Sequence, residues 1–155
     1  MAGFEPKTGF NMKLYRNTGS FATPTWLEIG EIGDVSLSDL TRMLAELKRR
    51  GKQFTKNLAS LIGSITVTFK LPFGLGATNY TYLRTAFFAG TVFEMAIMSG
   101  DIAVATEEGL RCPMVMEQFP WNQALEEASG HDVQVKVGYM VSGGSEVDPV
   151  WLVVA

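Results

Sequence analysis

Two segments of the chain alternate apolar and polar residues with a period of two. In "SITVTFKL" one face would carry Ile65, Val67, Phe69 and Leu71. In "HDVQVKVGYMV" one face would carry Val133, Val135, Val137, Tyr139 and Val141. Because successive side chains of a strand point to opposite faces of a sheet, this alternation predicts two antiparallel strands, each with one buried face.

Shorter apolar runs predict further strands. They cover residues 10–15, 26–32, 92–98, 114–119 and 150–154. Gly and Pro residues interrupt strands and favour turns, and their positions along the chain agree with strands in these runs.

One long segment shows a helical period instead. "SLSDLTRMLAELKRRG" would place on a single helical stripe Leu37, Leu40, Met43, Leu44 and Leu47. Ser36 and Asp39 have the spacing of a capping box, and Gly51 could end the helix. We therefore predict a helix over 36–50 that buries its leucines, although a strand leading into a long loop would use the same residues.

A second, shorter helix is predicted over 79–88. Thr78 is the candidate N-cap, and Tyr80, Leu83 and Phe87 would share one face. Many strands with few helices predict a mainly β fold class, an antiparallel β-sandwich or barrel with one or two flanking α-helices. The length of 155 residues predicts a single domain over 1–155, with an N-terminal arm over about 1–9.

Composition and charge narrow the function classes. Hydrophobic residues make up 46% of the chain, enough for a substantial core, and the net charge of -3 argues against general nucleic-acid binding. Cys112 is the only cysteine, so no internal disulfide can form. The start "MAGFEPKTGF" lacks the apolar stretch of a signal peptide and no segment suits a membrane span, so we expect a cytoplasmic compartment without membrane contact.

Candidate catalytic residues lack recognisable partners. His131 stands alone in "ASGHDVQ", where a turn histidine at the start of a strand is the simpler interpretation. Cys112 has neither a CxxC partner nor a histidine cluster, which favours a buried structural thiol. "LPFGLGATN" contains GxG without the third glycine or the Lys-Ser/Thr of a P-loop. We therefore predict no catalytic, cofactor-binding or metal-binding residues, and no enzyme activity.

A cationic run in this acidic chain precedes the predicted strand in "SITVTFKL". It contains Lys48, Arg49, Arg50, Lys52 and Lys56, with Phe54 as its one interleaved aromatic residue. A nucleic-acid patch would have more aromatic residues, whereas a self-assembly surface would find complementary acids in Glu146 and Asp148. Opposite charges on different faces allow head-to-tail contacts, which close rings or build filaments. These eight residues are the candidate subunit-interface residues.

Taken in order, several segments resemble bacteriophage major tail tube proteins, from long-tailed phages or phage-derived particles. They are "WLEIGEIGDVSLS", "LKRRGKQFTKNLASLIGSITVTFKL", "YTYLRTAFFAGTVFEMAIMSGD" and "DVQVKVGYMVSGG". Together they cover about two thirds of the chain. The predicted helix over 36–50 departs from the family, which has a strand and a long loop there. Type VI secretion tube proteins are similar in architecture.

The resemblance implies a β-sandwich with a flanking helix, assembled as six-fold rings that stack into a hollow tube. It implies that the chain's partners are other copies of itself, a tape-measure protein, and tail-terminator or tip proteins. DNA would pass through the lumen without specific binding. The location implied is a virion tail or phage-like particle, assembled in the host cytoplasm. The cationic run would then contact a neighbouring subunit instead of DNA.

Two other function classes remain open on the sequence. One is a different virion accessory, such as a head–tail connector subunit. The other is a small-ligand-binding β-barrel or barrel enzyme, with Trp26, Trp121 and Trp151 lining a cavity. Tryptophans on three separate strands are more often core anchors than cavity walls, so the tube protein is the favoured hypothesis.

Overall fold

The protein is described from a computed structural model. The described residues are 13–30, 32, 35–38, 42–48, 50–51, 53–54, 56–62, 65–72, 74, 77–122 and 130–155. The predicted N-terminal arm over about 1–9 lies outside them.

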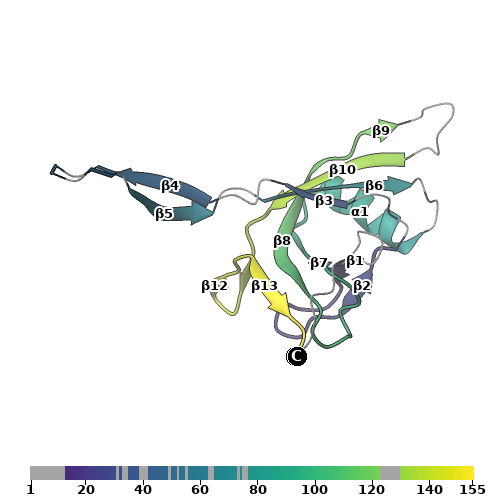
Figure 1. The fold of residues 1–155 in the computed structure, drawn as a ribbon. Coiled ribbons are helices and arrows are strands. Elements are labelled where there is room, and N and C mark those ends of the chain that lie inside the picture. Colours follow the sequence, from purple (N-terminus) through teal and green to yellow (C-terminus); the bar gives the residue numbers. More distant parts are fainter. Residues whose placement is uncertain are drawn as a thin grey trace.

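One nine-stranded antiparallel sheet forms the body of the molecule (Figure 1). Its path of neighbouring strands is β2 (Trp26–Glu28), β1 (Lys13–Asn17), β7 (Phe93–Met98), β8 (Glu108–Gln118), β10 (Gly130–Val137), β6 (Thr66–Pro72) and β3 (Val35–Ser38). Two strands lie off this path: β13 (Val150–Val153) pairs with β8, and β9 (Trp121–Asn122) pairs with β10. The mainly β fold class is thereby confirmed, as an open sheet with one helix among the described residues.

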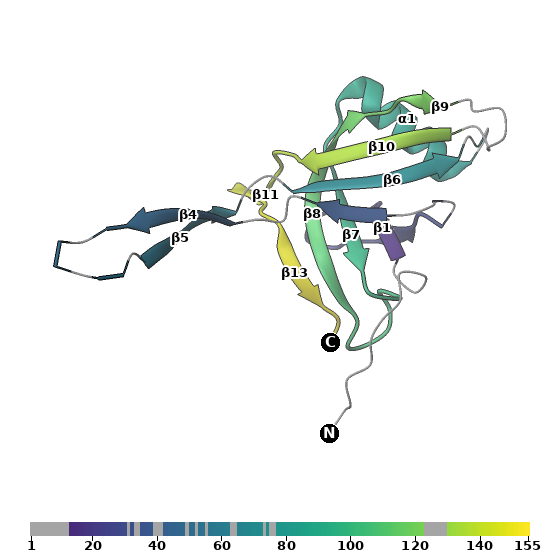
Figure 2. The same cartoon turned by 45° about the horizontal axis from the view of Figure 1, so that its top comes forward.

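The long strand β8 joins two halves of this sheet. Its first residues pair with β13, with Glu108 opposite Val153, while its last residues pair with β10, with Met116 opposite Val135. The register of β10 against β8 shifts between Gln134 and Val135, which is a β-bulge. Bulges bend strands and increase their twist, so β8 can curve from one half of the sheet to the other (Figure 2).

The main core lies between the two halves of the sheet and the helix α1 (Thr78–Ala89). Its buried members include Leu14, Val67, Phe69, Leu83, Met95, Met114, Val133 and Val135. The helix predicted over 79–88 is therefore confirmed, and its left-handed C-cap is Gly90. Its N-cap is Ala77 and makes no side-chain cap hydrogen bond, so the prediction of Thr78 as the cap was wrong.

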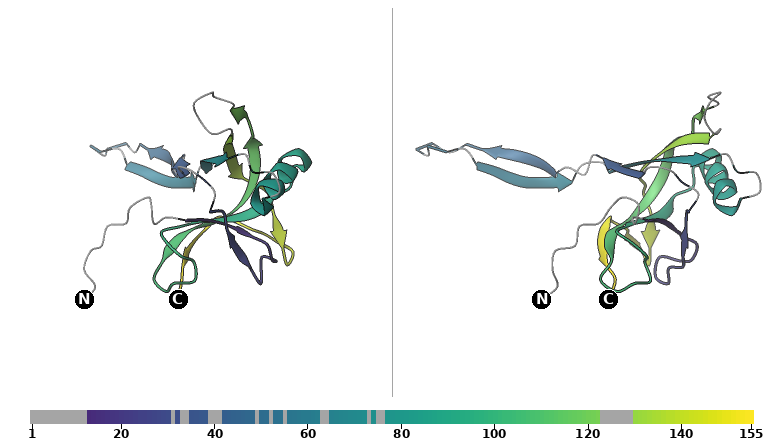
Figure 3. Two further views of the ribbon diagram at one scale, coloured as in Figure 1. Left: turned by 90° about the vertical axis from the view of Figure 1, so that its right-hand side faces the viewer. Right: turned by 45° about the vertical axis from the view of Figure 1, so that its right-hand side comes forward.

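The segment predicted as a leucine-burying helix forms strands, and this prediction was wrong. β3 adds to the main sheet, and β4 (Arg42–Leu47) pairs with β5 (Lys56–Ile62) as a separate two-stranded sheet. This hairpin projects from the body and stays outside it in further views (Figures 1 and 3). Leu44, predicted to be buried, is 60% exposed, and Leu40 lies outside the described residues.

The two alternating segments are strands with buried faces, as predicted. Ile65, Phe69 and Leu71 are all buried, as is Val133. The second segment differs at its end because β10 stops at Val137 and the chain turns into a short hairpin of β11 (Val141–Ser142) and β12 (Ser145–Glu146). Tyr139 and Val141, predicted to face inward, are therefore 71% and 50% exposed.

Candidate assembly surfaces

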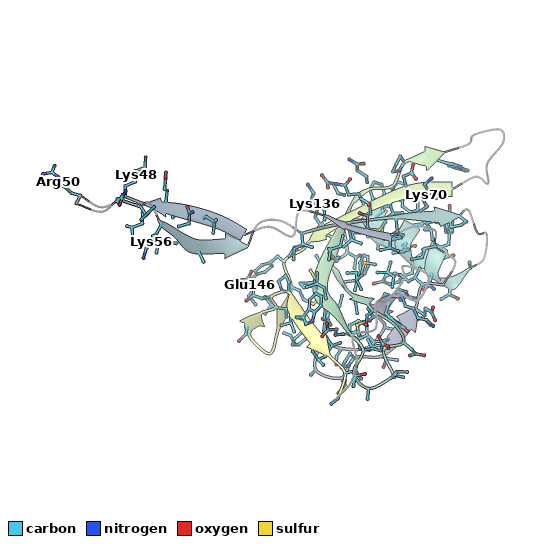
Figure 4. The ribbon with its side chains drawn as sticks, viewed as in Figure 1. Lys48, Arg50, Lys56, Lys70, Lys136 and Glu146 are labelled. Atoms are coloured by element: carbon cyan, nitrogen blue, oxygen red, sulfur yellow. The ribbon has the colours of Figure 1, made fainter. Side chains whose placement is uncertain are left out.

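The hairpin of β4 and β5, here called the arm, carries the predicted cationic residues at its far end. Lys48, Arg50 and Lys56 are exposed around the turn that joins the two strands (Figure 4). Lys48 lies 3.8 Å from the carboxylate of Glu46, an exposed pair that contributes little to stability. Arg49 and Lys52 lie outside the described residues. The cationic end of the arm thus points away from the body.

Apolar side chains are exposed along the same arm. Leu44 lies opposite Ala59, and Leu58 lies opposite Ala45, so the two leucines occupy different faces of the hairpin. Leu44 is 60% exposed, Leu58 52% and Phe54, at the turn, 76%. A two-stranded hairpin is marginally stable alone in water, and exposed apolar surface on both faces is typical of a segment that another surface covers.

The predicted acidic residues lie on the body. Glu146 ends β12 and Asp148 follows it, and both are exposed. Figure 4 shows Glu146 on the body and Arg50 at the opposite end of the arm. The fold therefore separates the cationic and acidic candidates, so these charges could meet only between different copies of the chain.

An open sheet edge is a further candidate surface, which the sequence reasoning did not identify. β13 pairs only with β8 among the described strands, and its "VWLV" sequence is apolar throughout. Val150, Trp151 and Val153 are 52%, 57% and 56% exposed. An exposed apolar edge strand is a template for pairing with another chain. The sequence feature that could have revealed this edge is "VWLV" itself, in which apolar residues do not alternate with polar ones.

The tryptophans do not have the role that the sequence suggested. Trp121 and Trp151 are 55% and 57% exposed, so the prediction that they are core anchors was wrong for both. Trp26 packs, partly buried, against a second small core cluster that contains Tyr15, Ala96 and Met98.

A partly buried ion-pair network, which the sequence reasoning also did not identify, lies beneath the loop after β1. Arg111 donates to both carboxylate oxygens of Glu94, over 2.7 and 2.9 Å, and to the carbonyl of Phe21 over 2.8 Å. Asn17 donates to Glu94 over 2.8 Å and accepts from the backbone N–H groups of Gly19 and Thr25. The sequence feature that could have revealed this ion pair is the single charged residue in each of two apolar segments, "FEMAIM" and "LRCPMVM".

His131 and Cys112 are both buried in the body. His131 is 5% exposed, its Nε2 lies 2.9 Å from the hydroxyl of Tyr80, and its ring stacks on Phe119 with centroids 3.9 Å apart. It is the second residue of β10 and not a turn residue, which corrects that part of the prediction. Burial raises the pKa of the Cys112 thiol to about 12, with the charge of Glu94 as a second cause, and the predicted buried thiol is confirmed.

Two properties of the described part of the chain bear on other functions. Among these residues, no helix has the length and apolar content that crossing a membrane requires. Nor do three or more His, Cys, Asp or Glu side chains of this part cluster as metal ligands would.

Solved structures match this fold, whereas no family model and no curated protein matches the sequence. A chain from the tail of an empty gene transfer agent particle, determined with C6 symmetry, matches with a TM-score of 0.67 at 12% identity, over 92% of this chain and 98% of that one. A chain of the SPP1 tail tube matches with a TM-score of 0.64 at 12% identity, over 85% and 76%. A chain of the six-fold anti-feeding prophage baseplate gives 0.64 at 10%, over 98% and 99%. The fold implied by the tail tube resemblance is thereby confirmed.

Proposed function

We propose that this chain, which has the fold of subunits from phage and phage-like tails, is a self-assembling subunit of a tail tube. Copies of it would form rings, and the rings would stack around a lumen that conducts DNA. Six subunits per ring are proposed because two of the matching assemblies were determined with six-fold symmetry. Its location would be a virion tail or phage-like particle that assembles in the host cytoplasm.

The arm is the observation that carries this proposal. In an unassembled monomer, the leucines on both faces of this projecting two-stranded hairpin are exposed to water, which is unfavourable. Seven residues at a rise of about 3.4 Å give β5 a length of roughly 24 Å, enough to lie across a neighbouring subunit. In the proposed tube the arm contacts another copy and loses this exposure.

The positions of the charges indicate which surface of the next copy the arm contacts. The cations lie at the end of the arm, and Glu146 and Asp148 lie exposed on the body. We propose that Lys48, Arg49, Arg50, Lys52, Phe54 and Lys56 contact a surface of the next copy that includes these acids. Single exposed ion pairs contribute only about 0–1 kcal/mol, but pairs repeated around a ring act together.

The remaining partners follow from the same proposal. A tape-measure protein would occupy the lumen before DNA, and tail-terminator or tip proteins would bind the two ends of the tube. DNA would pass without specific binding, which suits a chain with a net charge of -3. The role is structural and not catalytic, with the chain as one domain over 1–155.

The proposal is tested on concentrated protein by negative-stain electron microscopy and sedimentation. Wild-type protein should form rings or tubes. The triple variant Lys48→Glu, Arg50→Glu, Lys56→Glu should remain folded by circular dichroism but sediment as small species. The control Lys70→Glu, Arg84→Glu reverses exposed charges on β6 and α1 of the body and should still assemble.

DNA retention by the same variants separates the two interpretations of the cationic run. A nucleic-acid patch would lose salt-sensitive duplex binding in the triple variant while particles stayed normal. That result would overturn the assembly role of the arm. A wild-type protein that stays a monodisperse monomer and binds small apolar dyes would instead support a ligand-binding barrel.

A further inference from the structure

A cavity of about 270 Å³ lies at the end of β1, where the loop after this strand meets β7 and α1. Its walls include Arg16, Asn17, Tyr82, Glu94 and Met140. This volume is below the range of roughly 300–1,000 Å³ typical of pockets for drug-sized ligands, so the cavity suits a small ion or a single side chain.

Arg16 is the unusual residue of this cavity because it is a buried cation that forms no ion pair with any carboxylate of the described residues. The whole Arg16 residue is only 5% exposed. Its Nε donates to the neutral amide oxygen of Asn79 over 2.9 Å, and its guanidinium carbon lies 4.0 Å from the centroid of the Tyr82 ring. The ion pairs among the described residues do not include Arg16. Buried charges are ordinarily paired, since an unpaired one loses hydration without compensation.

The other charges at this site leave one positive charge uncompensated. Glu94, the one carboxylate among the described residues of the cavity wall, accepts two hydrogen bonds from Arg111 and is 3% exposed. Among the described residues at this site, two guanidinium groups and one carboxylate carry charge, so the local sum is one positive charge. Burial lowers the pKa of Arg16 below its ordinary value because desolvation disfavours the cation.

We propose that this cavity binds a carboxylate group, with Arg16 as its charged partner. A planar guanidinium can donate two parallel hydrogen bonds to the two oxygens of a carboxylate. One negative charge neutralises the site, whereas a phosphate dianion would leave an excess negative charge beside Glu94. Tyr82, Phe21 and Met140 supply apolar wall for the methyl or methylene groups attached to the carboxylate.

Two sources could supply this carboxylate. One is a free small carboxylate anion. The other is an aspartate or glutamate side chain of a second copy, a source that rests on the proposed assembly. Both have the same chemistry at Arg16, and assembled and unassembled protein distinguish them.

The first experiment measures the melting temperature of unassembled protein at pH 7, in sodium acetate or sodium chloride of equal ionic strength. Acetate should raise the melting temperature of the wild type by about 3 °C or more at saturation. Arg16→Met should lose this difference between acetate and chloride. Arg84→Met, which removes an exposed cation of α1, should retain it and controls for general salt effects. Inorganic phosphate should stabilise the wild type less than acetate.

A second measurement on the wild type covers the case that Arg16→Met does not fold. Titration with acetate should shift the backbone amide NMR signals of Thr18, Gly19 and Tyr82 with one saturating curve. Melting temperatures that are equal in acetate and chloride, together with unshifted amide signals, would show that Arg16 is only a structural group. Stronger stabilisation by phosphate would overturn the assignment to carboxylates.

The source is decided by sedimentation of assembled protein in increasing acetate. If an acidic side chain of a second copy occupies the cavity, acetate should lower the assembled fraction of the wild type more than chloride does. If a free anion is the occupant, acetate should leave assembly unchanged while still raising the melting temperature of unassembled protein. A wild type that fails to assemble under all conditions would overturn the tube proposal but not the acetate response of the cavity.

Discussion

The thiol of Cys112 lies fully buried in β8, at 0% exposure. Burial, and secondarily the charge of Glu94, raises the pKa of this thiol to about 12, so it is protonated at pH 8. Since the thiolate is the reactive form, we predict no labelling of native protein by iodoacetamide at pH 8 over hours, and fast labelling in urea. Mass spectrometry of the alkylated protein measures this. Rapid labelling without denaturant would contradict the buried position.

His131 predicts a pH dependence of stability. Burial lowers its pKa below 6.5, while hydrogen bonds to the backbone of Phe119 and Pro120 act in the opposite direction. The unfolded chain therefore binds more protons than the folded one just below pH 6.5, and the free energy of unfolding decreases as the pH falls through this window. From roughly one pH unit above 6.5 upward, both states are neutral at this residue and the contribution is constant.

Urea denaturation of the wild type and of His131→Gln, at pH 7.5 and at pH 5.5, measures this contribution. The wild type should lose more stability between the two pH values than the variant, because His131 is the only histidine and the carboxylates are common to both. Parallel losses would show that His131 titrates alike in the folded and unfolded chains.

At the scale of elements, the arm should tolerate charge that the core would not. Leu44 is 60% exposed on β4, so Leu44→Asp should change the free energy of unfolding of unassembled protein by no more than about 0.5 kcal/mol. Leu83→Ala, at 0% exposure on α1, should cost about 2–5 kcal/mol. Chemical denaturation measures both. A Leu44→Asp loss as large as that of Leu83→Ala would place the arm against the body.

The pairing of β7 with β8 depends on a close approach at Gly109. A Cβ atom at this position would lie 1.9 Å from the carbonyl oxygen of Ile97, so any larger residue must displace backbone. Gly109→Ala should therefore destabilise the fold by about 1–3 kcal/mol or more, measured as a lower melting temperature. Gly30→Ala is the matched control because a Cβ there meets no atom within 4 Å. Equal melting temperatures for the two variants would contradict the strand register.

At the scale of the whole molecule, the body and the arm should be separable. β4 and β5 pair with each other and with no other described strand, so the main sheet does not depend on them. A variant with residues 42–62 replaced by a short Gly–Ser linker should melt cooperatively, within a few degrees of unassembled wild type, and should form no tubes. Calorimetry and electron microscopy measure the two properties. Loss of cooperative melting would show that the arm is part of the domain.

The sequence by itself determined the mainly β class, the two alternating strands and the helix α1. In β6 and β10 the buried apolar residues, such as Val67, Phe69, Val133 and Val135, alternate with polar ones. In α1 the buried residues Tyr80, Leu83 and Ala86 recur at helical spacing. Such patterns can be read within a single segment, because the period of its buried residues depends only on whether that segment is a strand or a helix. The burial of the Cys112 thiol was also predicted, because the sequence places neither a CxxC partner nor a histidine cluster with it. The order of the matching segments indicated the tail tube fold.

Only the tertiary structure decided the form of residues 42–62 and the places of the candidate charges. Leu37, Leu44 and Leu47 satisfy a helical period as well as a strand, and local propensity could not choose between them. Whether these residues form a helix or strands depends on pairing of β3 with β6, which is distant in sequence, and of β4 with β5 across the hairpin turn. The burial of Arg16 beside Asn79 and Tyr82 and the separation of Lys48 from Glu146 likewise arise from packing between elements, because sequence spacing does not specify which side chains meet across a sheet.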